Sequence, residues 1–128
     1  MDNLIIGIEG YIEKVVEYKD TATAYGSGLV EVFATPAMIG LMEMTAQLSV
    51  QEKLPVGHAT VGTEVNIKHL KATPVGAKVY AKTNLIEVDG KRLVFEVAAF
   101  DDKGQIGSGF HTRFIINNER FMEKLKDL

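Results

Sequence analysis

The sequence predicts an α+β fold, in which one long central helix is wrapped by a curved antiparallel β-sheet. Residues 36–53 are rich in Met, Leu, Ala and Glu and contain no cluster of β-branched residues, which favours a helix. After Gly57 the pattern changes to an alternation of apolar and polar residues, in several stretches separated by turn residues. One apolar helix followed by a meander of hairpins is an α+β architecture.

Three short segments precede the helix. Residues 11–20 are compatible with a strand or a helix, and we expect a strand. Residues 21–28 are small and flexible and indicate a loop. Residues 29–33 alternate apolar side chains with Glu31, which predicts a further short strand.

The sequence also marks both ends of the helix. Thr35 is the expected N-cap, and Pro36 suits the first helical position because it has no N–H to leave unpaired. Pro55 and Gly57 both stop a helix, so we expect it to end near Lys53.

Four strands should follow, joined by hairpins such as the one that Asp89 and Gly90 predict. The expected strands cover residues 60–70, 78–88, 92–100 and 105–116, with a short amphipathic helix after them at 119–127. The inward side chains should be Val61, Thr63, Val65, Ile67 and His69 in the first strand, and Val79, Ala81, Thr83 and Leu85 in the second. A curved sheet wrapped around one helix in this way is the hotdog fold.

Composition limits the classes of function. The 128 residues are 46% hydrophobic, which is enough for one core, so we expect a single domain over residues 1–128. A net charge of -3 argues against nucleic acid as a partner. The absence of Cys excludes disulfides and a Cys nucleophile. No apolar run approaches the ~20 residues of a membrane span, and residues 1–10 do not resemble a signal peptide, so we expect a cytoplasmic protein without membrane contact.

Glu43 is the most informative residue of the helix. It is the only charged residue between Thr35 and Ala46, and apolar or small residues surround it in almost every direction. A helix that is apolar all round is usually buried, so Glu43 should be shielded from water and is a candidate general base or nucleophile. Gly40 lies one turn earlier and would allow a ligand or partner chain to approach. The alternative is a structural Glu43 that pairs with a buried Arg or caps a neighbouring backbone.

The sequence predicts a different role for each of the three histidines. His69 lies on the apolar side of its strand and is a candidate acid/base, although a core imidazole is the alternative. His111 should be structural or exposed, and His58 exposed. Their spacing does not suggest a metal site. Thr35 and Glu43 are eight residues apart, or ~12 Å along a straight helix, so they cannot share a hydrogen bond.

Several motifs together resemble the fluoroacetyl-CoA thioesterase family of the hotdog superfamily, over residues 29–125. The motifs are Glu31-Val32-Phe33-Ala34-Thr35, Gly40-Leu41-Met42-Glu43, Gly62-Thr63 with His69, Ala72-Thr73-Pro74-x-Gly76, Asp89-Gly90-x-Arg92-Leu93 and Ile106-Gly107-Ser108-Gly109-x-His111-x-Arg113. The spacing between the Thr, Glu and His positions is retained, which makes the resemblance more specific than any single motif.

The resemblance implies an enzyme that hydrolyses a short-chain acyl-CoA thioester without a cofactor. Its implied catalytic residues are Thr35, Glu43 and His69, and the Gly62 backbone would lie near the thioester. It further implies a homodimer with each active site at the subunit interface, where Gly40 would allow close approach. Arg113, with Lys68 and Lys71, is a candidate contact for the CoA phosphates.

The resemblance also leaves alternatives open. In the fluoroacetyl-specific enzyme an aromatic lid precedes the Glu-Val-Phe-Ala-Thr motif, whereas here Tyr25 is the only aromatic residue in 21–28. We therefore expect a general thioesterase rather than a fluoroacetate-specific one. Two other hypotheses remain, since one fold hosts many functions. In these, the protein is either a non-catalytic acyl-CoA sensor or a hydratase or dehydratase of the same fold.

Overall fold

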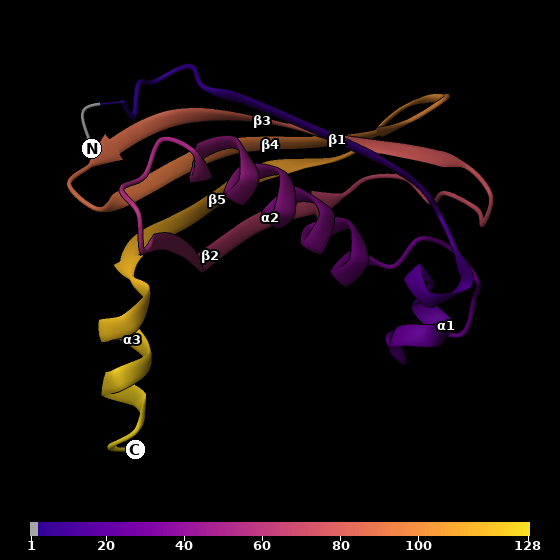
Figure 1. Ribbon diagram of the computed structural model, residues 1–128. Coiled ribbons are helices and arrows are strands. Elements are labelled where there is room, and N and C mark those ends of the chain that lie inside the picture. The colour runs from indigo at the N-terminus through magenta and orange to yellow at the C-terminus, as the bar shows by residue number, and fades with distance from the viewer. Residues whose placement is uncertain (1–2) are drawn as a thin grey trace.

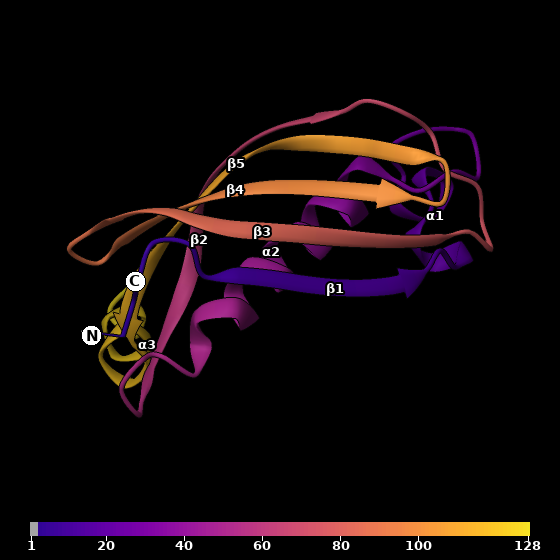
Figure 2. The ribbon, with the colours of Figure 1, turned by 90° about the horizontal axis from the view of Figure 1, so that it is seen from above.

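The computed structural model describes residues 3–128 as a five-stranded antiparallel sheet that wraps around helix α2 (Figure 1). The strands are β1 (Glu9–Val15), β2 (His58–His69), β3 (Lys78–Asp89), β4 (Arg92–Asp101) and β5 (Gly104–Asn117), in the order β1-β3-β4-β5-β2. The helices are η1 (Tyr18–Asp20), α1 (Ala22–Tyr25), α2 (Thr35–Gln51) and α3 (Asn118–Leu125). Figure 2 shows the long strands passing over α2, which confirms the predicted hotdog fold.

The hydrophobic core lies between α2 and the concave face of the sheet. Met38, Met42, Ala46 and Val50 are fully buried and share one face of α2 because they are four residues apart. They pack in one cluster with the inward side chains of β3 and β4, including Leu85. Val79, Ala81, Thr83 and Leu85 are all buried, as predicted. Each large apolar side chain buried here contributes about 1.5–3 kcal/mol.

Both ends of α2 differ slightly from the sequence-based expectation. The N-cap is Ala34 rather than Thr35, and no side chain caps the helix. Thr35 cannot serve as the cap because it lies inside the first turn, where its hydroxyl bonds to His69 instead. The helix ends at Gln51, two residues before the expected end.

The segment before α2 is where prediction fails most. Residues 29–33 form no strand, because they make only isolated bridges: Val32 opposite Pro74, and Phe33 opposite Thr21. The predicted strand over 11–20 ends at Val15 and continues as η1. The predicted loop contains α1, which the Thr21 hydroxyl caps by accepting from the Ala24 N–H.

Strand β2 forms one edge of the sheet and contains a bulge. Gly62 pairs with Arg113 and Glu64 with Thr112, so Thr63 is an extra residue without a partner. Before the bulge Thr60 is buried and Gly62 faces α2, whereas the expected inward residues Val61 and Thr63 are not buried. The prediction for these two residues was therefore wrong, because alternation alone does not reveal a bulge. Val65, also expected to be inward, is 45% exposed.

Helix α3 leaves the end of β5 and projects away from the sheet, as Figure 1 shows. The Asn117 side chain caps it by accepting from the Arg120 N–H. Its existence confirms the predicted amphipathic helix near residues 119–127. Among the described residues, no helix is both long and apolar enough to cross a membrane.

Candidate active site

Thr35 and His69 form a direct pair, although 34 residues separate them in the sequence. Thr35 is the first residue of α2 and His69 is the last residue of β2. Thr35 Oγ1 lies 2.8 Å from His69 Nδ1. Burial lowers the pKa of His69, so the imidazole is neutral at neutral pH. A neutral ring with its proton on Nε2 accepts the Thr35 hydroxyl proton at Nδ1. The buried Nε2 atom has no hydrogen-bond partner in the described part of the chain.

A cavity of about 400 Å³ opens beside this pair. Thr35 and His69 both line it, together with side chains that are mostly small: Ala22, Ser27, Val32 and Ala34 among them. Lys71 also lines the cavity, and its Nζ forms an ion pair with Asp101 Oδ1 at 3.2 Å. The hydroxyl–imidazole pair therefore faces a space large enough for a small ligand.

Glu43 lies two turns further along α2, in a second group of residues. Its Oε2 is 3.9 Å from Arg113 Nη1 and 4.0 Å from His111 Nε2, both too long for a hydrogen bond. The Glu43 side chain is 41% exposed, so the expected shielding from water is wrong for the isolated chain. The physical reason is that α2 is covered on one face only, and Met44 and Leu48 are about half exposed.

Arg113 is buried and is held by β2. Its Nε donates to Thr60 Oγ1 at 2.7 Å and its Nη2 to the Thr60 carbonyl at 2.9 Å. Its Nη1 lies 3.1 Å from His111 Nε2. The structural alternative, in which Glu43 pairs with a buried Arg, is supported in part, because Arg113 forms an ion pair with Glu43 at 3.9 Å. The hydrogen bonds of the guanidinium go to Thr60 and His111.

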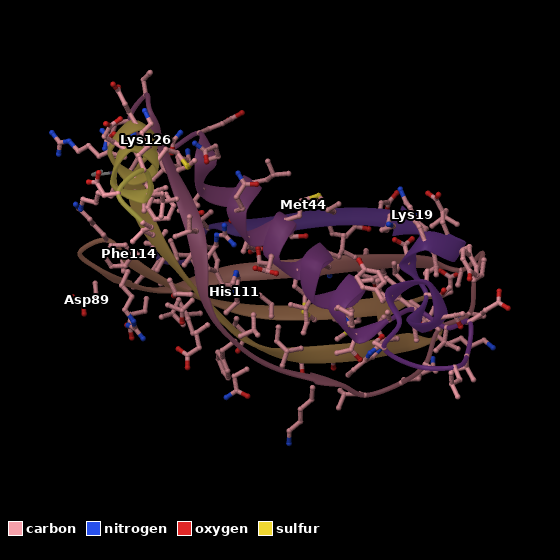
Figure 3. All side chains as sticks on the ribbon, turned by 90° about the horizontal axis from the view of Figure 1, so that it is seen from below. Lys19, Met44, Asp89, His111, Phe114 and Lys126 are labelled. Atoms are coloured by element: carbon pink, nitrogen blue, oxygen red, sulfur yellow. The ribbon has the colours of Figure 1, made fainter. Side chains whose placement is uncertain are left out.

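His111 is the residue that sequence reasoning missed. It is 1% exposed and contacts the Glu64 carbonyl through Nδ1 at 2.8 Å. In Figure 3 it lies on the side of the sheet that α2 crosses. The signal in the sequence was its two-residue spacing from Arg113, which places both side chains on one face of β5.

The two predicted glycines have different surroundings. A Cβ on Gly62 would lie 2.8 Å from Glu43 Oε2 and 3.2 Å from His111 Cε1, so Gly62 makes the room that the carboxylate occupies. A Cβ on Gly40 would meet nothing within 4 Å. The structure thus brings Gly62, Glu43 and Arg113 together, and it gives Gly40 no close neighbour within this chain.

The predicted site residues therefore form two groups, one beside each of two positions along α2. The Thr35–His69 pair lies at the start of α2, and the group of Glu43, Gly62, His111 and Arg113 lies about 12 Å further on, given 1.5 Å of rise per residue. Within residues 3–128 no three His, Asp or Glu side chains gather as a metal site would require.

Comparison with known proteins gives concordant matches. The family model described as fluoroacetyl-CoA-specific thioesterase matches residues 16–119. A fluoroacetyl-CoA thioesterase from Streptantibioticus cattleyicolor is 40% identical over 96 residues, which cover 75% of this chain and 69% of that protein. A structure of the fluoroacetyl-CoA thioesterase FlK superposes with a TM-score of 0.91, at 33% identity and 98% coverage of both chains. A thioesterase superfamily member from Thermus thermophilus gives 0.89 at 25% identity, over 99% of this chain and 96% of that one.

Proposed function

This chain belongs to the fluoroacetyl-CoA-specific thioesterase family, and we propose that it hydrolyses a short-chain acyl-CoA to the free acid and CoA. The observation that carries the proposal is the hydrogen bond between Thr35 and a neutral His69 at the wall of a cavity. In the reaction, the oxygen of water bonds to the thioester carbonyl carbon, the C–S bond breaks, and the CoA sulfur leaves with a proton.

Thr35 and His69 would act on the thioester as a pair. The Thr35 hydroxyl orients the acyl carbonyl or serves as a second nucleophile, since the adjacent imidazole can take its proton. His69 is neutral, so it accepts a proton in one step and returns it to the leaving sulfur in another. The required base lies within hydrogen-bond reach of the hydroxyl without any rearrangement of the chain.

Glu43 would supply the second function, either as the base that activates water or as a nucleophile that forms a transient acyl anhydride. The Arg113 guanidinium is suited to stabilise the oxyanion, because its Nη1 lies 3.9 Å from the carboxylate. The Gly62 N–H stays a second candidate, since the Gly62 backbone lies close to Glu43. Arg113 is buried, so it is placed for the reacting end of the substrate rather than for the CoA phosphates. Lys68 and Lys71 remain the candidates for those phosphates.

We propose that a homodimer unites the two groups. Thr35 and Glu43 are eight residues apart on one helix, and Glu43 is partly open to solvent. Strand β2 is a sheet edge and half of its residues are exposed, so a second copy can pair with it. Met44 and Leu48 form an exposed apolar face on α2 that the same partner would cover. Each active site would then lie at the subunit interface.

We propose that the cavity, in which Phe33 is the one large aromatic residue among the described residues, accepts a range of short acyl groups rather than fluoroacetate alone. Its lining is mostly small side chains, and Tyr25 is half exposed and not part of it. No aromatic side chain from residues 21–28 therefore closes over the Thr35–His69 pair. We expect comparable turnover of acetyl-CoA and its longer homologues.

The test is the release of CoA from a panel of acyl-CoA substrates that includes acetyl-CoA and fluoroacetyl-CoA. Glu43→Gln should lose most activity, whereas the matched control Glu52→Gln, at the exposed C-cap of α2, should keep it. Equal and negligible rates for wild type and Glu43→Gln across the panel would contradict the proposal. Tight acyl-CoA binding without turnover would instead indicate a sensor, and hydration of crotonyl-CoA a hydratase. The cytoplasmic location stays a prediction, which cell fractionation would test.

A further inference from the structure

We propose that His111 is a positioning residue, which fixes the Arg113 guanidinium beside the Glu43 carboxylate by offering it a lone pair. The kinetic part of this inference rests on the proposed thioesterase function. The structural part rests on the contacts of His111 alone and can be tested without a substrate.

The hydrogen bonds of His111 determine its tautomer. A backbone carbonyl only accepts, so the 2.8 Å contact between Nδ1 and the Glu64 carbonyl requires the proton on Nδ1. Nε2 of the neutral ring then carries a lone pair, to which Arg113 Nη1 donates at 3.1 Å. A proton on Nε2 would place two donors against each other. Burial, as the largest cause, and the Arg113 charge lower the pKa of His111, which maintains the neutral ring.

The bonds of Arg113 show what His111 adds. Thr60 takes the Nε proton and one Nη2 proton, so it anchors one side of the guanidinium. His111 takes one proton of Nη1, the nitrogen that lies 3.9 Å from Glu43 Oε2. The second Nη1 proton stays free for an oxygen in this region. Without the lone pair of His111, a buried donor would be left unsatisfied and the orientation of Nη1 would be lost.

The bulge in β2 links this arrangement to the backbone. Glu64 follows the extra residue Thr63, and its carbonyl is the one that His111 contacts. Gly62, on the other side of Thr63, leaves the space in which Glu43 and Nη1 approach each other. One irregularity therefore supplies both the acceptor for His111 and the room for the carboxylate.

Two amide substitutions separate positioning from a merely structural role. In His111→Gln the longer side chain places an amide oxygen near the former Nε2, where it accepts from Arg113. In His111→Asn the shorter side chain places its NH₂ near the former Nδ1, where it bonds only to the Glu64 carbonyl. We expect kcat to fall by about tenfold or more in His111→Asn with little change in KM, because the guanidinium is misplaced. His111→Gln should retain most of the wild-type kcat.

Nitrogen NMR supplies a readout that needs no activity. Wild-type protein should show His111 protonated at Nδ1 only, and distinct, slowly exchanging Arg113 Nη signals. Those signals should persist in His111→Gln and merge in His111→Asn. A proton on Nε2 in the wild type, or unchanged Arg113 signals in His111→Asn, would overturn the proposal, as would a kcat for His111→Asn equal to or above that of His111→Gln. If no acyl-CoA is hydrolysed, the proposed function fails and the NMR results still decide this inference.

Discussion

The two groups of polar residues along α2 differ in how complete they are within one chain. The Thr35–His69 pair is joined by a 2.8 Å hydrogen bond, whereas Glu43 approaches Arg113 and His111 only to 3.9–4.0 Å and is 41% exposed. The first group is assembled by the fold of a single copy. The second has its cation, Arg113, and its space in place, but its carboxylate is not covered within one chain. A chain can thus prepare one half of a site fully and leave the other half for a partner or a substrate.

Activity should be most sensitive to substitution in the Thr35–His69 pair. His69→Ala removes the base from Thr35, and we expect kcat to fall by about 10²–10⁴-fold, the usual contribution of a positioned acid or base. His58→Ala is the matched control, because His58 belongs to neither group. Steady-state release of CoA measures both. A loss of less than threefold in His69→Ala would show that the pair is not catalytic.

The exposed face of α2 tests whether a partner completes the second group. Leu48→Lys places a charge on the proposed interface, so we expect sedimentation to show a monomer and activity to fall in parallel. Val56→Lys is the control, since Val56 is also exposed but lies in the loop after α2. A fully active monomer of Leu48→Lys would contradict the proposed dimer, because Glu43 would then work without a partner.

Substitutions at Gly62 and Gly40 should have smaller effects and test the space around each group. Gly62→Ala forces a methyl group to 2.8 Å from the Glu43 carboxylate, and we expect kcat/KM to fall about tenfold or more as the carboxylate shifts. Gly40→Ala meets nothing within this chain and should raise helix stability by up to about 1 kcal/mol. Thermal unfolding and kinetics on both variants distinguish the cases. Lost activity in a more stable Gly40→Ala would show that a ligand or partner approaches there.

The smallest expected effect is a dependence of stability on pH. Burial lowers the pKa of His69 and of His111 in the folded chain, so the unfolded chain binds more protons below the ordinary value of 6.5. This contribution to stability is complete above that pH and is lost as the pH falls towards the folded-state pKa values. Urea unfolding from pH 7.5 to 5 should show the decline, and His69→Gln together with His111→Gln should reduce it. An unchanged slope would contradict the assignment of both rings as neutral.

Local patterns in the sequence predicted the hotdog sheet and the long helix because alternation and helical spacing are properties of neighbouring residues. Residues 29–33 alternate like a strand, yet they form only isolated bridges, because their backbone hydrogen bonds run to Thr73 and Ala22 in different segments. Thr35 was expected to cap its helix, and only the fold reveals that the Thr35 hydroxyl bonds to His69 instead. The role of His111 was missed because its contact with the Glu64 carbonyl depends on a bulge in β2, which the alternation of residues does not predict.

The bulge at Thr63 determines which face of the sheet Gly62 and His69 share. In a regular strand the side chains of odd and even positions point to opposite faces, and Gly62 and His69 differ by seven, an odd number. In a strand that kept all its residues but formed no bulge, one of them would face the convex side of the sheet. Deletion of Thr63 would keep both on one face, because the two would then be six positions apart, an even number. The insertion of a residue elsewhere between them would instead turn one half of the predicted site away from α2, while leaving every amino acid of that site unchanged.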